Sequence, residues 1–212
     1  MKPILQLALD LYDTNEALQM CEMTHEYVDI LEVGTILIIS KGTEPIRLVK
    51  EKYSYKTILA DTKCTDAGKK VGDLCKNAGA NIMTCSAAAG VETMIQAKTS
   101  VGEIWIEMFG NIDEGDYQKW LNIGIDTLIY HKSKDDVEKG AGWSKEDILK
   151  VEKLINKGFK VCITGGLTPS NIEDFKDLKI HSIIVGSSIL NAKSPKEKAK
   201  EFRNAIDRNW NC

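Results

Sequence analysis

Asp61, Lys63 and Asp66 form an Asp-x-Lys-x-x-Asp segment whose residue types and spacing are suited to stabilising a negative charge. Asp61 and Lys63 are two positions apart, so on an extended strand their side chains point to the same side. The carboxylate favours the charged form of the lysine, and a fixed ammonium group can stabilise an anion that develops on a substrate. Asp66 falls beyond that strand, in a loop or in the first turn of a helix. The segment therefore predicts an anion-stabilising site at a strand end.

Single polar residues also end other short apolar segments of the chain. Asp10, Glu32, Glu107 and His131 each lie at the end of such a segment. One acidic residue in this position is most often a turn former or a helix cap. Several charged groups that converge from different strands are costly to bury unless they bind something. Taken together, these residues and Lys63 predict a binding or catalytic site.

Two glycine-containing segments are suited to binding phosphate. Gly165 and Gly166 follow one apolar segment, and Gly186 and Ser187 follow the last one. Bare backbone N–H groups near helix N-termini attract an anion, because they lack intrahelical partners and lie at the positive end of the helix dipole. Each pair alone could equally form only a tight turn. Their occurrence after the last two segments favours a phosphate site.

The elements that must position these residues are short apolar segments that alternate with longer amphipathic ones, the pattern of a parallel sheet covered by helices. Eight strand-helix units predict a (β/α)₈ TIM barrel, in which active sites form at the C-terminal ends of the strands. A six-stranded doubly wound sheet is the structural alternative, but no Gly-x-Gly-x-x-Gly turn follows the first segment. The expected strands are residues 4–10, 28–34, 57–61, 81–85, 103–107, 127–131, 160–164 and 182–186.

Length and composition limit the classes of function. The 212 residues predict a single domain over residues 1–212, and the net charge of −3 with scattered charges gives no basic surface for nucleic acid or lipid. The N-terminus has no signal-peptide pattern, and no apolar run approaches the length of a membrane span. The six cysteines are irregularly spaced, which favours reduced thiols. We therefore expect a cytoplasmic protein that acts on a small molecule.

Several segments together resemble one family. The Asp-x-Lys-x-x-Asp segment resembles the signature of the orotidine-phosphate decarboxylase superfamily. Further matches resemble its group of 3-keto-L-gulonate-6-phosphate decarboxylases and hexulose-6-phosphate synthases, and the resemblance runs from the first strand to Trp210. The matching segments are residues 28–35, 130–135, 163–167 and 185–189, together with Trp143.

The resemblance implies a mechanism and a site. Mg²⁺ would be the cofactor, bound by Glu32 and Asp61, and a phosphorylated sugar would be the substrate. The product of decarboxylation would be L-xylulose 5-phosphate, formed through a cis-enediolate in a route for using ascorbate or related acids. The chain would form a homodimer, with Asp66 entering the active site of the neighbouring subunit.

The resemblance also assigns roles to individual residues. Lys63 would stabilise the enediolate, and His131 with Lys134 would deliver a proton through water. Thr164 and Glu107 would orient waters and sugar hydroxyls. The remaining substrate-binding residues would be Asp10, Glu32, Asp61, Gly165, Gly166, Gly186 and Ser187, with Asp66 contacting substrate hydroxyls and the Lys63 ammonium group.

Three features of the sequence favour the decarboxylase within this group. They are Glu107, Thr164, and the long segment from His131 to Trp143. Two positions differ from the usual decarboxylase pattern, because Lys134 and Ser187 stand where arginine is usual. Lysine keeps the charge of arginine without its planar fork, and serine removes a cation beside the phosphate. The alternatives are hexulose-6-phosphate synthase, a phosphosugar isomerase or epimerase, and a non-catalytic barrel that binds sugar phosphates.

Overall fold

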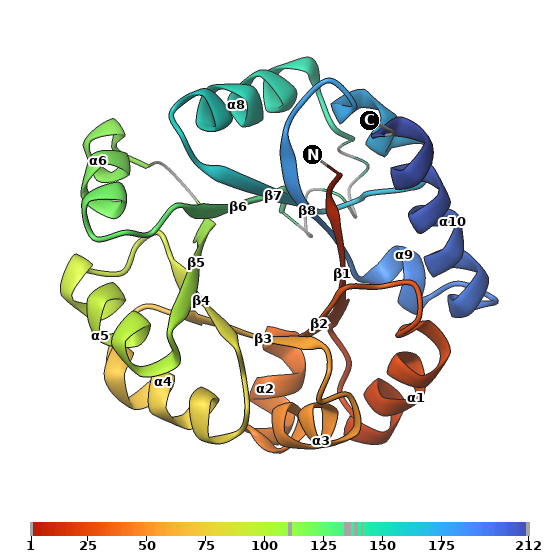
Figure 1. The fold of residues 1–212 in the computed structure, drawn as a ribbon, viewed down its shortest axis with the longest axis horizontal. Helices are drawn as coiled ribbons and strands as arrows, with labels where there is room; N and C mark the ends of the chain where they lie inside the picture. The colour runs from red at the N-terminus through yellow and green to blue at the C-terminus, as the bar shows by residue number, and fades with distance from the viewer. Residues whose placement is uncertain (1, 110–111, 134–136, 138–139, 141, 211–212) are drawn as a thin grey trace.

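The protein is a closed barrel of eight parallel strands, surrounded by helices (Figure 1). The computed structural model describes residues 2–109, 112–133, 137, 140 and 142–210. Each strand pairs with the next along the chain, and β8 pairs with β1 to close the barrel. The predicted (β/α)₈ fold is therefore confirmed. The strands are β1 (Ile4–Leu9), β2 (Ile30–Val33), β3 (Thr57–Cys64), β4 (Ile82–Ser86), β5 (Glu103–Met108), β6 (Thr127–His131), β7 (Lys160–Thr164) and β8 (Ile180–Val185).

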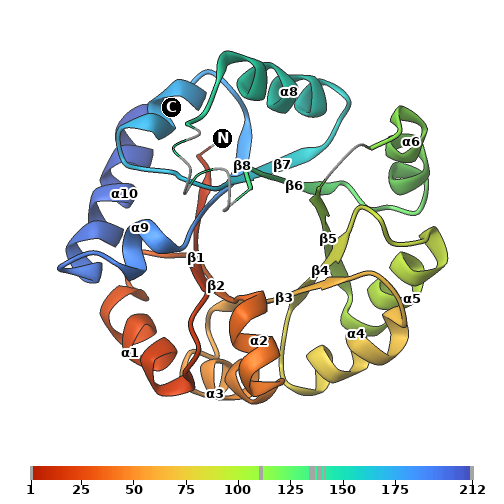
Figure 2. The same ribbon diagram turned by 180° about the vertical axis from the view of Figure 1, so that it is seen from behind.

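Helices cover the outer face of the barrel, as the view from behind also shows (Figure 2). They are α1 (Thr14–Thr24), α2 (Thr35–Lys41), α3 (Glu44–Lys52), α4 (Gly68–Asn77), α5 (Val91–Val101), α6 (Glu114–Asn122), α8 (Lys145–Asn156), the 3₁₀ helix η1 (Asn171–Phe175), α9 (Ser187–Leu190) and α10 (Pro195–Asn209). Capping residues mark several of their starts. Asp13 accepts hydrogen bonds from the N–H groups of Asn15 and Glu16 at the start of α1. Ser144 and Asp147 form a reciprocal capping box at the start of α8.

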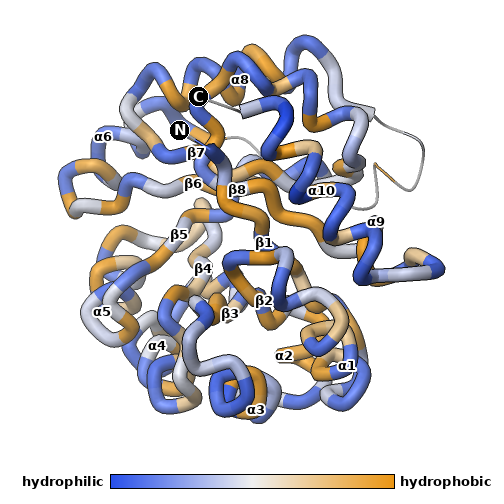
Figure 3. Tube along the Cα trace, turned by 45° about the vertical axis from the view of Figure 1, so that its right-hand side comes forward, coloured by the Kyte–Doolittle hydropathy of each residue, from blue (hydrophilic) through white to orange (hydrophobic). Residues whose placement is uncertain are grey.

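Alternation along the strands divides the buried residues between two clusters. Leu5, Leu7 and Leu9 of β1 belong to the large cluster between the strands and the helices. The inner cluster takes one residue from each strand, namely Ala8, Ile30, Leu59, Ile82, Trp105, Ile129, Cys162 and Ile184. In the hydropathy colouring, long hydrophobic stretches mark β1 and β8, whereas the surrounding helices alternate between hydrophobic and hydrophilic residues (Figure 3). The inner cluster therefore forms an apolar layer across the barrel.

The segment after β7 departs from the expected strand-helix repeat. Each strand was expected to be followed by a helix, but β7 is followed by η1, a 3₁₀ helix of five residues. Three-ten helices have poorer hydrogen-bond geometry than α-helices and stay short. Ile172 and Phe175 of η1 are fully buried, so this short element still covers the barrel. In the part of the chain that the structure describes, no helix is both long and apolar enough to span a membrane.

Candidate active site

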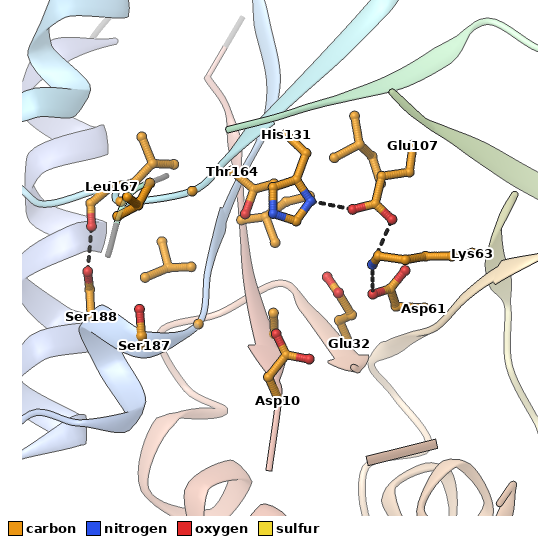
Figure 4. A pocket seen from close by; sticks show the side chains of 18 residues that line it. Asp10, Glu32, Asp61, Lys63, Glu107, His131, Thr164, Leu167, Ser187 and Ser188 are labelled. Atoms are coloured by element: carbon orange, nitrogen blue, oxygen red, sulfur yellow. Dashed lines mark hydrogen bonds and ion pairs between the residues drawn. The ribbon is translucent and has the colours of Figure 1, made fainter. Parts of the chain in front are cut away.

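A ring of mostly polar residues lies directly above the apolar layer, at the C-terminal ends of the strands. Each member comes two positions after the inner-layer residue of its strand, so the alternation of a strand points both side chains inward. The ring consists of Asp10, Glu32, Asp61, Thr84, Glu107, His131, Thr164 and Gly186. All of these except Thr84 line one pocket, together with Lys63, Gly165, Gly166 and Ser187 (Figure 4). The structure thus brings together most of the predicted site residues.

An ionic network occupies one side of this pocket (Figure 4). The Lys63 Nζ atom lies 2.5 Å from an Asp61 carboxylate oxygen and 2.7 Å from Glu107 Oε2. The other Glu107 oxygen pairs with Nδ1 of His131. Burial favours the neutral form of Lys63, but the carboxylates of Asp61 and Glu107 outweigh it and raise the lysine pKa above its ordinary value. Lys63 is therefore a permanently charged group at neutral pH.

Lys63 enters the pocket through an irregularity in β3. The register of β3 against β4 shifts between Ala60 and Cys64, and Lys63 has a φ of 45°. A positive φ is unfavourable for a residue with a Cβ atom, so other contacts must hold it. The Lys63 N–H group donates to Thr84 Oγ1 at 2.9 Å, and the ammonium group is held by the ion pairs. Simple alternation did not predict this bend.

Asp61 is held by neighbours on both of its oxygens. Thr84 donates to Oδ1 at 2.7 Å, and Thr35 donates to Oδ2 at 2.6 Å, the oxygen that also pairs with Lys63. Burial acts to raise the pKa of Asp61, yet the Lys63 charge and these hydrogen bonds lower it overall. Asp61 is therefore a fixed carboxylate.

Glu32 is buried with little compensation for a negative charge. Gln6 donates to Glu32 Oε2, and Ser182 donates to the side-chain amide oxygen of Gln6 at 3.3 Å, which orients the amide. Burial raises the pKa of Glu32 well above its ordinary value, and the nearby carboxylates of Asp61 and Asp10 raise it further. A buried carboxylate in this situation suits a cation ligand, because a bound cation would supply the missing positive charge.

The donor set suits Mg²⁺ better than a metal held entirely by side chains. In the ranges that the structure describes, no three His, Cys, Asp or Glu side chains cluster as a metal cage. Magnesium commonly binds one or two carboxylates and keeps water and substrate oxygens in its other positions. Glu32 and Asp61 fit that pattern.

The opposite side of the pocket is built from backbone and neutral side chains. Gly165 and Gly166 have φ values of 99° and 63°, which favour glycine. Ser187 and Ser188 begin α9, so their N–H groups have no partner within that helix. Ser188 donates to the Leu167 carbonyl at 2.6 Å and so joins the two segments (Figure 4).

The expectation that both glycine segments precede a helix was wrong for the first of them. Gly186 is the residue before α9, but the element after Gly165 and Gly166 is η1, which begins only at Asn171. The N–H groups at Gly165 and Gly166 are therefore presented by the left-handed turn itself, without a helix dipole. This arrangement resembles a backbone nest more than a helix terminus.

One predicted residue, Asp66, lies away from the pocket. Asp66 is exposed, between β3 and α4, and does not line this pocket. Its predicted entry into a neighbouring subunit's site stays a prediction. Lys134 lies outside the described residues, so its predicted role with His131 also stays a prediction.

Several residues that the structure places at the site were not predicted from the sequence. Thr84 holds Asp61, and Gln6 holds Glu32. Phe109 packs its ring 5.0 Å from that of His131 and lies 5.9 Å from Lys63 Nζ, measured to ring centroids. Inward alternation, counted on every strand, was a signal for Gln6 and Thr84. Phe109 follows the end of β5, and no signal in the sequence marked it.

Known proteins are similar to this chain over most of its length. Residues 3–202 match the model of the Orotidine 5'-phosphate decarboxylase / HUMPS family. The chain belongs to this family. Within the family, it is 37% identical over 212 residues to the 3-keto-L-gulonate-6-phosphate decarboxylase UlaD of Salmonella paratyphi B, covering 98% of each chain.

Solved structures of two kinds of protein are similar to this family member. A ligand-bound crystal structure of KGPDC from Streptococcus mutans superposes with a TM-score of 0.96 at 35% identity, covering 98% of this chain and 99% of the other. The 3-hexulose-6-phosphate synthase from Salmonella typhimurium gives a TM-score of 0.88 at 29% identity, covering 99% and 100%. The fold is therefore shared with both.

Proposed function

We propose that the protein decarboxylates 3-keto-L-gulonate 6-phosphate to L-xylulose 5-phosphate and CO₂. The observation that carries the proposal is the charged Lys63, which Asp61 and Glu107 hold on one side of a pocket whose other side is backbone and neutral side chains. Such a pocket can accept a phosphate at one end and an anionic carbon centre at the other. The similarity to UlaD and to KGPDC supports this substrate class.

The reaction follows from the position of the charges. When the bond between the carboxyl carbon and C2 breaks, its electron pair moves toward the adjacent C3 carbonyl, which gives a cis-enediolate and CO₂. The Lys63 ammonium group stabilises that negative charge, because its position is fixed before the reaction begins. Protonation at C2 then completes L-xylulose 5-phosphate.

His131 is the group that we assign to proton delivery. Glu107 pairs with its Nδ1 atom, which orients the ring and leaves Nε2 as the atom for transfer through water. In our proposal Thr164 and Glu107 orient water and sugar hydroxyls around this ring. Asp10, at the C-terminal end of β1, binds a sugar hydroxyl. Lys134 would assist His131.

Glu32 and Asp61 would hold Mg²⁺. When bound, Mg²⁺ acts as a Lewis acid toward the oxygens of the substrate and stabilises developing negative charge. The support for this assignment is the burial of Glu32, whose negative charge has little compensation, and the fixed carboxylate of Asp61. Removal of Mg²⁺ by EDTA should abolish activity, and added Mg²⁺ should restore it.

We further propose a homodimer in which Asp66 completes the neighbouring site. Support comes from its exposed position directly after the strand that carries Lys63. Mixing inactive Asp66→Asn protein with inactive Lys63→Ala protein should restore part of the activity, since one site of a mixed dimer keeps both residues. No recovery in a mixture that forms mixed dimers would contradict the shared site.

Hexulose-6-phosphate synthase is the second candidate, and the structural similarity to the Salmonella typhimurium synthase favours it. That reaction joins formaldehyde and D-ribulose 5-phosphate, and it needs the same stabilised enediolate. CO₂ release from the keto acid phosphate, measured beside formaldehyde-dependent loss of D-ribulose 5-phosphate, separates the two. A barrel without either activity would leave an isomerase, an epimerase or a binding protein.

We place the reaction in the cytoplasm, in a route that uses ascorbate or related acids. The buried cysteines Cys21, Cys64, Cys75, Cys85 and Cys162 are all free thiols, which suits a reducing compartment. The substrate class is an oxidised six-carbon acid that has already been phosphorylated. Growth of a gene-deletion strain on such an acid would test the route: we expect the deletion to impair this growth.

A further inference from the structure

Trp143 lies behind the glycine turn that follows β7, on the side away from the pocket. Its indole Nε1 donates a hydrogen bond to the Gly165 carbonyl oxygen at 2.7 Å. Gly165 and Gly166 line the pocket, whereas Trp143 does not and instead packs against the cluster between the strands and the helices. The indole therefore contacts the turn from its outer side.

The geometry of the peptide bond links this contact to the pocket. In a trans peptide, the carbonyl of one residue and the N–H of the next lie in one plane and point in opposite directions. The Gly165 carbonyl points to Trp143, so the N–H group of Gly166 points away from the indole, and Gly166 is itself a residue that lines the pocket. A hydrogen bond on the outer side thus sets the direction of a donor on the inner side.

The glycine turn needs an external restraint, because glycine residues do little to restrict the backbone conformation themselves. Glycine has more conformational freedom than other residues, and both residues here have positive φ. A Cβ atom added to Gly165 would lie 2.2 Å from the Lys132 carbonyl oxygen, so a stiffer residue does not fit. Rigidity must therefore come from the neighbours of the turn.

The indole itself is firmly held. Its ring meets that of Phe175 edge-on with centroids 5.0 Å apart, and that of Tyr130 with centroids 5.8 Å apart. Asp147, four residues later in α8, accepts from the Tyr130 hydroxyl at 3.0 Å and pairs with Lys132 at 2.7 Å. The start of α8 is thereby tied to the end of β6.

We propose that Trp143 is a positioning residue of the phosphate end of the pocket. It fixes the peptide between Gly165 and Gly166 so that the Gly166 N–H group is presented to the phosphate of the substrate. This inference rests on the proposed function only in placing a phosphate at the glycine turn. It assigns to Trp143 an effect on substrate binding and none on the chemical step.

Trp143→Phe tests the inference, because it removes the N–H donor and keeps an aromatic ring. We expect the KM of the keto acid phosphate and the Kd of D-ribulose 5-phosphate, measured by calorimetry, to rise by the same factor of about three to ten, with kcat unchanged. Trp210→Phe is the matched control, since Trp210 Nε1 donates to the Leu178 carbonyl at 3.1 Å away from the pocket. The control should leave KM and Kd unchanged.

A second variant separates the donor from the packing of the ring. Benzothienylalanine at position 143 replaces the N–H by sulfur at nearly constant shape, and it should give the same rise in Kd with a melting temperature close to that of the parent. An unchanged Kd in both variants would overturn the inference. It would also be overturned if the variants lost kcat only in proportion to the fraction of protein that is no longer folded. The Kd measurement requires no turnover, so it tests the role of Trp143 even if the protein does not catalyse the proposed reaction.

Discussion

The two sides of the pocket differ in what they offer a substrate. One side carries Lys63 between two carboxylates, with His131 beyond them. The other carries the backbone of Gly165, Gly166 and the start of α9, where neutral Ser187 is the exposed side chain. Charges with fixed positions suit a reaction in which negative charge develops, whereas backbone donors suit a phosphate whose charge stays constant. We therefore expect changes on the first side to alter kcat, and changes on the second to alter KM.

Lys63→Ala should break the ionic side most completely. We expect kcat to fall by about 10²- to 10³-fold, because the variant lacks a preorganised cation at the developing enediolate. Steady-state kinetics of CO₂ release measures the effect. Lys69→Ala is the control, since that lysine pairs with Asp73 on the exposed face of α4. A Lys63 variant within about tenfold of the parent would mean a contribution below about 1.4 kcal/mol and would refute the mechanism.

Glu32→Gln should remove the response to metal. The variant keeps the shape of the side chain but loses a carboxylate ligand, so we expect Mg²⁺ affinity to weaken by about 100-fold in calorimetry. In EDTA the same variant should melt at a higher temperature than the parent, because the burial that raises the pKa of Glu32 makes its negative charge costly. A variant that melts lower in EDTA and still binds Mg²⁺ normally would argue against Glu32 as a ligand.

Ser187→Arg should sharpen the contrast from the neutral side. An added guanidinium group beside the first N–H groups of α9 should lower the KM of the phosphorylated substrate by about tenfold, with little change in kcat. Ser187→Ala, which removes the hydroxyl without adding charge, is the matched control and should leave KM nearly unchanged. If the arginine variant has an unchanged or higher KM, residue 187 does not face the phosphate.

Asp147→Asn should have the smallest effect on activity and should act mainly on the stability of the protein. Burial acts against the charge of Asp147, but hydrogen bonds from Lys132, Ser144 and Tyr130 lower its pKa overall. A lowered folded-state pKa stabilises the protein above the unfolded-state pKa, and this stability is lost as the pH falls through the folded-state value. We expect about 1 to 2 kcal/mol of destabilisation at pH 7, narrowing below about pH 4.

Urea unfolding of Asp147→Asn and parent protein between pH 7 and pH 3 measures this difference. Asp73→Asn, which breaks an exposed helix-surface pair, is the control and should cost less than about 0.5 kcal/mol at any pH. A constant difference across the pH range would mean that the charge of Asp147 does not contribute to the stability.

Much of the fold and of the ionic side was predictable from the sequence. Residues two positions apart on a strand share a face, and the strand-helix repeat predicts that all strand ends meet at one rim of a barrel. Those two rules brought Asp10, Glu32, Asp61, Glu107 and His131 to one pocket, as the structure shows. The same rules predict that Thr84 points inward, since it lies two positions after Ile82 on β4.

What the sequence by itself determined was therefore the barrel and the ring of side chains above its apolar layer, because a period of two is a local property of the strand. The tertiary structure decided the rest. The positive φ of Lys63, the hydrogen bonds of Thr35 and Thr84 to Asp61, and the indole of Trp143 behind Gly165 join segments far apart in the chain. Such contacts depend on how strands stagger and loops close, and no local spacing encodes them.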